Sequence, residues 1–148
     1  MRCLAAFVAV LVISSCSSSQ PSTTPQATTG DLVIPATVPN GKVEVVVKRG
    51  YAVGETVRAT VRLIPATGTL RGPLDPIIQA SGFHATATVR HLVVDPMTVS
   101  ARSPDVLVVW DMRDDSGQPV GGDDYSLVFN VTDDAGRTTT VGTTLQVR

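Results

Sequence analysis

Acidic side chains gather in one short segment, WDMRDDSGQPVGGDDY, which runs from Trp110 to Tyr125. Its five carboxylates belong to Asp111, Asp114, Asp115, Asp123 and Asp124. Calcium is bound in proteins by about six to eight oxygen ligands, and clustered carboxylates can supply several of them. These aspartates are therefore the candidate calcium ligands of the chain. The alternative is turn formation, because the short Asp side chain bonds to its own backbone in turns.

Other reactive side chains are few. The two histidines, His84 and His91, lie seven positions apart on a predicted strand, so they point to opposite faces and cannot chelate one metal from it. No Gly-x-Ser-x-Gly motif surrounds a serine, and the only glutamates, Glu44 and Glu55, are not placed as an acid–base pair. We therefore expect no enzymatic activity and no cofactor apart from the calcium considered above.

Apolar and polar residues alternate along most of the chain after Lys42. Period-two alternation predicts half-buried strands, and it occurs over residues 42–49, 55–64, 82–94, 105–111, 125–132 and 137–147. One stretch is ambiguous, because Pro76 to Gln79 could hold a single helical turn. The pattern predicts an all-β fold over residues 42–148, an Ig-like β-sandwich of about seven antiparallel strands. A small closed barrel is the alternative.

The first residues form a predicted export signal. One basic residue, Arg2, precedes an apolar run of ten residues, Leu4 to Ile13. This run is too short for a transmembrane helix of about 20 residues and suits a secretory signal peptide. The next residues, Ile13-Ser14-Ser15-Cys16, resemble the lipobox of bacterial lipoproteins. The resemblance implies that residues 1–15 are the signal peptide and that acyl chains on Cys16 anchor the protein to a membrane.

Residues 16–41 are predicted to be the lipidated cysteine and a flexible tether. Ser17 to Asp31 is rich in Ser, Thr, Pro and Gln, and such a segment buries too little apolar surface to fold. A short edge strand at Leu32 to Ile34 is allowed, with Pro35 and Pro39 ending it. We expect the protein in the bacterial cell envelope, lipid-anchored at the outer membrane or the cell surface.

The charge balance excludes some partners. Removal of residues 1–15 takes away one charged residue, Arg2, so the net charge of −1 becomes −2. This value argues against a nucleic-acid partner and against a polybasic membrane-binding surface. Because Cys3 lies in the removed segment and Cys16 would be acylated, the mature chain is expected to have no disulfide and no free thiol.

The segment from Val108 to Thr140 carries a family resemblance. Its motifs are Trp110-Asp111, Asp115-Ser116-Gly117-Gln118-Pro119-Val120, Tyr125 and Asp133-Asp134-Ala135-Gly136. They resemble the C-terminal hairpin of bacterial Ig-like domains of the flagellar hook-cap type and of BsuPI-type proteinase inhibitors. Met112 stands where these domains usually have glycine, and the segment before Tyr125 is longer than usual. The resemblance implies a spacer, an assembly scaffold or a binding module.

Two aromatic residues flank the acidic segment. Trp110 and Tyr125 are placed to pack as a cross-strand or inter-sheet pair. The same segment would then be held at both ends by apolar contacts, which is consistent with a structural connection.

Three arginines are the candidate partner-binding residues. Arg58, Arg62 and Arg90 fall on solvent-facing positions of two predicted strands, and they would form one basic face if those strands pair. Such a face could attract an envelope protein or an anionic glycan. The alternative is that the charges protect strand edges from unwanted pairing.

The leading functional prediction is a lipid-anchored envelope module that binds or assembles with a partner. One alternative is a proteinase inhibitor of the BsuPI type, with Leu63 to Ile77 as its protruding loop and Leu70-Arg71 as the bait. The other is a calcium-dependent adhesion domain. The sequence predicts neither the partner nor the oligomeric state.

Overall fold

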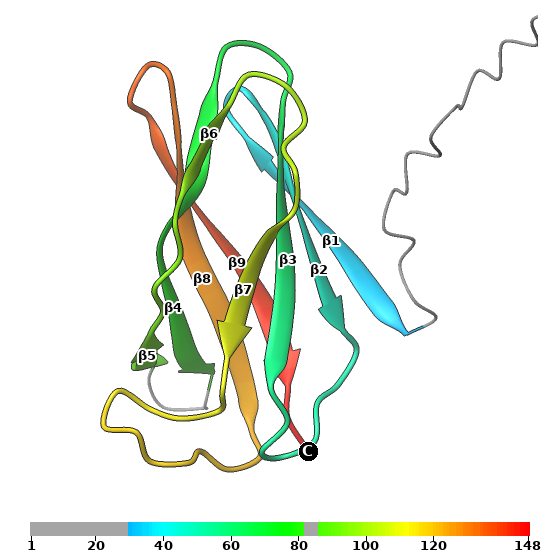
Figure 1. Ribbon diagram of the computed structural model, residues 1–148, viewed down its shortest axis with the longest axis vertical. Helices are drawn as coiled ribbons and strands as arrows, with labels where there is room; N and C mark the ends of the chain where they lie inside the picture. Colours follow the sequence, from blue (N-terminus) through cyan, green and yellow to red (C-terminus); the bar gives the residue numbers. More distant parts are fainter. Residues whose placement is uncertain (1–29, 82–85) are drawn as a thin grey trace, which may run out of the picture.

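The computed structural model describes residues 30–81 and 86–148. The regular structure in these two ranges consists of β-strands without a helix (Figure 1). The strands are β1 (Asp31–Val38), β2 (Gly41–Lys48), β3 (Val57–Pro65), β4 (Leu70–Ser81), β5 (Thr86–His91), β6 (Met97–Val99), β7 (Val106–Trp110), β8 (Asp124–Asp133) and β9 (Thr138–Gln146). The helical turn allowed at Pro76 to Gln79 is wrong, because these residues lie within β4.

The strands form two antiparallel sheets that pack face to face (Figure 1). Sheet 1 has the order β1-β2-β3-β7. Sheet 2 has the order β5-β4-β8-β9, and the short strand β6 also pairs with β4. Strands β2, β3 and β7 take the places of A, B and E in an Ig-like sandwich, and β4, β8 and β9 take those of C, F and G. The predicted antiparallel β-sandwich is confirmed, with nine strands instead of about seven.

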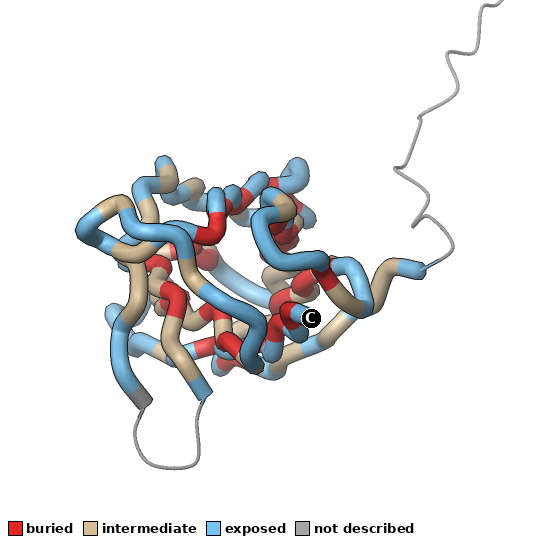
Figure 2. The backbone as a smooth tube through the Cα atoms, turned by 90° about the horizontal axis from the view of Figure 1, so that it is seen from below, coloured by how far each residue is buried: buried red, intermediate tan, exposed pale blue. Residues whose placement is uncertain are grey.

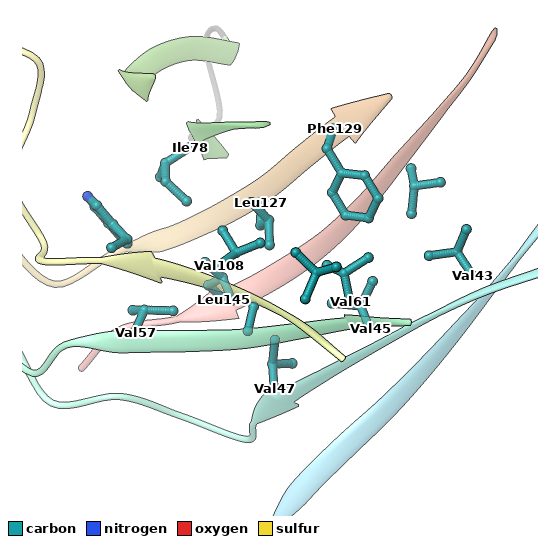
Figure 3. Packing of buried hydrophobic residues seen from close by; sticks show 14 of the residues in the cluster. Val43, Val45, Val47, Val57, Val61, Ile78, Val108, Leu127, Phe129 and Leu145 are labelled. Atoms are coloured by element: carbon teal, nitrogen blue, oxygen red, sulfur yellow. The ribbon is translucent and has the colours of Figure 1, made fainter. Parts of the chain in front are cut away.

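One hydrophobic core fills the space between the sheets. Val43, Val45 and Val47 of β2 point inward and are at most 2% exposed. They face residues of sheet 2 such as Leu127 and Phe129 (Figure 3). Seen along the sheets, the buried residues gather between the layers and the exposed ones lie outside (Figure 2). The predicted apolar faces of β2, β3, β7, β8 and β9 are confirmed.

The fifth strand departs from its predicted pattern. The alternation over residues 82–94 predicts that Ala87 and Val89 face the core, but Ala87 is exposed and Val89 is half-buried. Strand β5 is an outer strand of sheet 2, paired only with β4 and through a register shift, so its inner face is incompletely covered. Phe83 and His84, which belong to the same predicted strand, lie outside the described residues.

Strand β1 pairs with β2 over all eight of its residues, from Asp31 opposite Lys48 to Val38 opposite Gly41. Just before it, the N–H of Arg49 donates to the carbonyl of Gly30 at 3.2 Å. Hydrogen-bonded pairs alternate with non-hydrogen-bonded pairs in an antiparallel ladder. Gly30 and Arg49 form a hydrogen-bonded pair, so Pro35 and Glu44, five positions further along the ladder, form a non-hydrogen-bonded pair. The nitrogen of Pro35 therefore faces away from β2.

This geometry corrects two predictions. Proline is tolerated in an edge strand when its nitrogen faces outward, so Pro35 does not end β1. The sandwich therefore begins at Asp31, and the predicted tether boundary before Lys42 is wrong for residues 31–41. The signal peptide, the lipidated Cys16 and the tether as far as residue 29 lie outside the described residues.

The turn between β8 and β9 is closed by Asp133. Its Oδ1 accepts the N–H groups of Ala135 at 2.9 Å and Arg137 at 2.8 Å, and its Oδ2 accepts Arg137 Nε at 2.6 Å. Arg137 also donates to Asn40 at 2.9 Å, which links this turn to the β1–β2 turn. Burial raises the pKa of the Asp133 carboxyl, and the bonds from Arg137 and Ala135 lower it by more, so the pKa lies below its ordinary value.

We expect Asp133→Asn to destabilise the protein at neutral pH, because asparagine lacks the carboxylate that Arg137 binds. A depressed folded-state pKa contributes stability above the unfolded-state pKa of about 3.9, and this contribution is lost as the pH falls through the folded-state value. The difference from the wild type should therefore be largest above about pH 5 and shrink toward about pH 2. Urea denaturation across this range measures it, with Asp134→Asn as the control. A difference that does not change with pH would contradict the role of the charge.

Candidate functional site

The acidic segment crosses from one sheet to the other. Because β7 belongs to sheet 1 and β8 to sheet 2, residues 111–123 connect the two layers and are not the turn of a hairpin. The rings of Trp110 and Tyr125 meet across the core edge to face, with centroids 5.1 Å apart and planes at 66°. The predicted aromatic contact is confirmed in its inter-sheet form.

Both aromatic side chains also hold the loop. Trp110 Nε1 donates to the carbonyl of Arg113 at 2.9 Å, and the Tyr125 hydroxyl donates to the carbonyl of Gly121 at 2.9 Å. Met112 has a φ of 55° and a buried side chain. This left-handed conformation is one that favours glycine. The loop is therefore a fixed part of the sandwich.

The five candidate calcium ligands have separate local partners. Each carboxylate accepts a bond from a nearby backbone N–H or pairs with a basic side chain. The partners are Arg113 N for Asp111, Gln118 N for Asp114, His91 for Asp115, Asp124 N for Asp123, and Arg148 for Asp124. Within residues 30–81 and 86–148, no three His, Cys, Asp or Glu side chains are grouped so as to hold a metal ion. The fold uses these aspartates in turns and pairs.

Asp115 fastens the loop to β5. Its Oδ1 accepts the N–H of His91 at 2.9 Å, and its Oδ2 lies 2.6 Å from His91 Nδ1. The Asp115 N–H donates to the carbonyl of Val89 at 3.0 Å, and Arg90 Nη1 donates to the carbonyl of Asp114 at 2.7 Å. The bonds from the backbone and the ring of His91 hold the pKa of the Asp115 carboxyl below its ordinary value.

We expect calcium to leave the melting temperature of the protein within about 1 °C of its starting value. A site with a dissociation constant of about 1 mM, as in extracellular modules, would add about 1.4 kcal/mol at 10 mM calcium and raise the melting temperature by several degrees. The dispersed carboxylates provide no such site. Circular dichroism melts with calcium, and with magnesium as the control, measure the shift. A calcium-specific rise of several degrees would show that the aspartates rearrange around the ion.

The three candidate partner-binding arginines do not form one face. Arg58 and Arg62 lie on β3 in sheet 1, whereas Arg90 lies on β5 in sheet 2. Arg62 is 9% exposed and donates to both carboxylate oxygens of Asp105, at 2.7 and 2.9 Å, and to Glu44 at 3.2 Å. The bonds to Asp105 and then to Glu44 raise the pKa of Arg62. The predicted basic face is wrong, and Arg62 is part of a structural ion-pair network.

The predicted inhibitory loop is also wrong. Residues 63–77 form the end of β3, a short turn and most of β4. Leu70 is fully buried, and Arg71 lies between Thr98 of β6 and Thr132 of β8. A bait held in the middle of a sheet cannot enter a protease cleft while the strand stays paired.

An open groove lies where the two sheets part. Strand β1 is the outer strand of sheet 1 and β9 the outer strand of sheet 2, and they diverge toward Asp31 (Figure 1). The groove has a volume of about 500 Å³. It is lined by Leu32 and Ile34 from β1, Lys48 and Arg49 from the end of β2, and Gly142, Thr143, Thr144 and Gln146 from β9.

The outer edge of β9 presents unpaired backbone groups to this groove. In the β8–β9 ladder, the N–H of Val147 donates to the backbone carbonyl of Asp123 at 3.0 Å. The N–H of Asp133 donates to the backbone carbonyl of Arg137 at 3.1 Å. Both bonds involve odd-numbered residues at the ends of β9, and hydrogen-bonded pairs alternate with non-hydrogen-bonded pairs between them. The even-numbered residues of β9 therefore lie in non-hydrogen-bonded pairs, and their N–H and C=O groups point away from β8. These residues are Thr138, Thr140, Gly142, Thr144 and Gln146. The Gln146 carbonyl accepts Tyr51 N–H at 2.9 Å, which closes this end of the edge.

The groove also contains an unsatisfied polar group. Thr143 is 5% exposed, and its hydroxyl has no hydrogen-bond partner among the described residues. Buried polar groups are normally paired, so this hydroxyl is an unmet hydrogen bond next to the groove. Sequence reasoning missed the groove. The signal that could have indicated it is the last strand itself, which has no charged residue and no proline from Thr138 to Gln146.

The fold and the groove define a β-sandwich with one open edge, and comparison with known proteins adds no family to this description. No protein-family model matches the chain, and no curated protein matches it. A search of the described residues for membrane-spanning helices found none of sufficient length and apolar character.

Proposed function

We propose that this protein is a lipid-anchored, non-catalytic binding or assembly module of the bacterial envelope that binds a partner protein through the outer edge of β9. The lipobox-like residues Ile13 to Cys16 support the anchor. A rigid Ig-like sandwich supports a role in presenting a surface, since such folds host binding functions on their edges and loops.

The contrast between β9 and the other sheet edges carries this proposal. Strand β1 has Pro35 in its middle, β5 ends with Arg90 and His91, and β7 has five residues. Proline, charge and short length all protect exposed strands from pairing. Strand β9 has nine residues and none of these protections. An exposed edge of this kind is suited to accept an added strand from another protein.

We expect a photo-reactive amino acid at Thr144 to cross-link a partner in native envelopes. The same probe at Thr88, on the opposite outer strand of sheet 2, should capture it at least about fivefold less, because the contact depends on backbone pairing with β9. The full-length protein is irradiated in intact cells, and the cross-linked product is quantified by immunoblotting.

A blocking substitution provides the control for this experiment. A Cβ at Gly142 would lie 3.7 Å from Val128 Cγ2, an ordinary contact, so Gly142→Lys fits the strand. It places a charge in the middle of the edge and should remove the Thr144 cross-link. Equal cross-linking from Thr88 and Thr144, or a product that persists with Gly142→Lys, would refute binding through this edge.

Replacement of the lipidated cysteine tests the anchor. We expect Cys16→Ala to abolish incorporation of radioactive palmitate and to move at least about 90% of the protein out of the lipid-anchored membrane fraction, because stable anchoring needs two or more acyl chains. Cys3→Ala is the matched control and should still be labelled. Palmitate incorporation into the Cys16→Ala protein would contradict lipidation at this residue.

A further inference from the structure

Building on the proposed function, we infer that the β1–β9 groove takes an extended segment of another protein, with apolar side chains at alternate positions and an acidic side chain at the end near Arg49. The inference depends on the proposed role of the β9 edge and names the chemistry of its partner. Four features of the groove determine this chemistry.

The first feature is the backbone edge. Thr140, Gly142 and Thr144 direct their N–H and C=O groups outward from β9, and another extended chain can form a ladder with these groups. The proline of β1 makes that strand a poor acceptor, since Pro35 has no N–H to donate toward the groove. The incoming segment therefore adds to sheet 2 next to β9.

The second feature is the apolar wall opposite that edge. In a strand added to β9, every second side chain points to the same face as the inward residues Val141, Thr143 and Leu145. That face is turned toward sheet 1, where Leu32 and Ile34 of β1 are half-buried against the core and line the groove. A volume of about 500 Å³ accommodates several aliphatic side chains. The segment must therefore have apolar residues at alternate positions.

The third feature is the buried Thr143 hydroxyl, which has no partner among the described residues. It lies in the groove wall between the outward-facing Gly142 and Thr144. Because Thr143 points to the inward face of β9, a serine or threonine at the one inward position of the segment next to it would satisfy it, and the other inward positions would be apolar.

The fourth feature is the charge of the groove. Two cations, Lys48 and Arg49, line one end, and none of the described residues that line the groove is acidic. Lys48 is held by Glu55 at 2.8 Å, whereas Arg49 makes no ion pair with any described residue. An aspartate or glutamate at that end of the segment would complement Arg49.

A second copy of this chain fits the groove less well. Two β9 edges could pair around Gly142, but the inward side chains of Val141, Thr143 and Leu145 are at most 5% exposed and belong to their own core. A second copy would therefore have no side chains to place against Leu32 and Ile34, and no acidic residue of its β9 would reach Arg49. The observations favour a separate peptide segment.

Synthetic peptides test the inference with the lipidated full-length protein in detergent micelles. The probe is a fluorescein-labelled peptide, Asp-Thr-Val-Thr-Val-Thr-Val-Asp, and its binding is followed by fluorescence anisotropy. We expect saturable binding, and weaker binding by about two- to fivefold when both aspartates are lysines, as one exposed ion pair allows. A peptide with proline in place of the second of its three threonines should not bind, because proline has no N–H to complete the strand ladder.

Protein variants locate the binding. Arg49→Glu should reverse the preference so that the lysine peptide binds more tightly. Thr144→Lys should reduce binding at least about tenfold by placing a charge on the accepting edge, whereas Thr88→Lys on the opposite outer strand should leave binding unchanged. Circular dichroism confirms that each variant is folded.

The outcomes separate this inference from the proposed function. The inferred partner chemistry would be overturned if Thr144 cross-links a partner but neither peptide binds, or if Thr144→Lys does not weaken peptide binding. Either result would not refute the proposed role of the β9 edge. A dimer in analytical ultracentrifugation that is removed by Gly142→Lys would instead identify a second copy as the occupant and also overturn the inference. Absence of both cross-linking and peptide binding would refute the two proposals together.

Discussion

The strict alternation of side chains in paired strands is the constraint on which this structure depends. Val43, Val45 and Val47 on one sheet can meet Leu127 and Phe129 on the other only if every second residue of each strand points inward. A shift of one residue in register would expose the whole apolar set, so the core fixes the register of each inner strand. The same requirement commits the inward residues of β9 to the core and leaves its outward backbone groups to the solvent.

The outer strands of a two-layer sandwich each have one edge without a partner strand. In this protein, the outer strands differ in how well that edge is protected against pairing. Strand β1 contains a proline whose nitrogen faces away from β2, β7 is short, and β5 carries charge at its end. Strand β9 has only threonine, glycine and glutamine on its outward positions. Because β1 diverges from β9, the least protected edge also borders the opening between the sheets (Figure 1). A partner strand in that opening would complete both the ladder and the core.

The most acidic part of the chain is structural. Residues 111–123 cross between the sheets, and the polar atoms of Trp110 and Tyr125 hold the loop backbone at two points. The aspartates accept bonds from nearby N–H groups, which gives each carboxylate its own partner and keeps the negative charges apart. The buried Arg62 likewise serves the fold, since removal of either partner of a buried pair would leave an uncompensated charge. The groove adds the cations Lys48 and Arg49, of which Lys48 is paired with Glu55.

For β2, β3, β7, β8 and β9 the sequence by itself determined where the strands lie and which faces they bury, since alternation is a local property that the chain shows directly. It also indicated the turn role of aspartates in the acidic segment, which Asp114 fulfils by accepting the N–H of Gln118, and the candidate lipidation at Cys16. The tertiary structure decided which strands became edges, that Arg62 is buried between Glu44 and Asp105, and that Arg58 and Arg90 lie on different sheets. It also decided that Pro35 lies within a strand. These features depend on pairing between distant segments, and the pattern within one strand does not specify its neighbours.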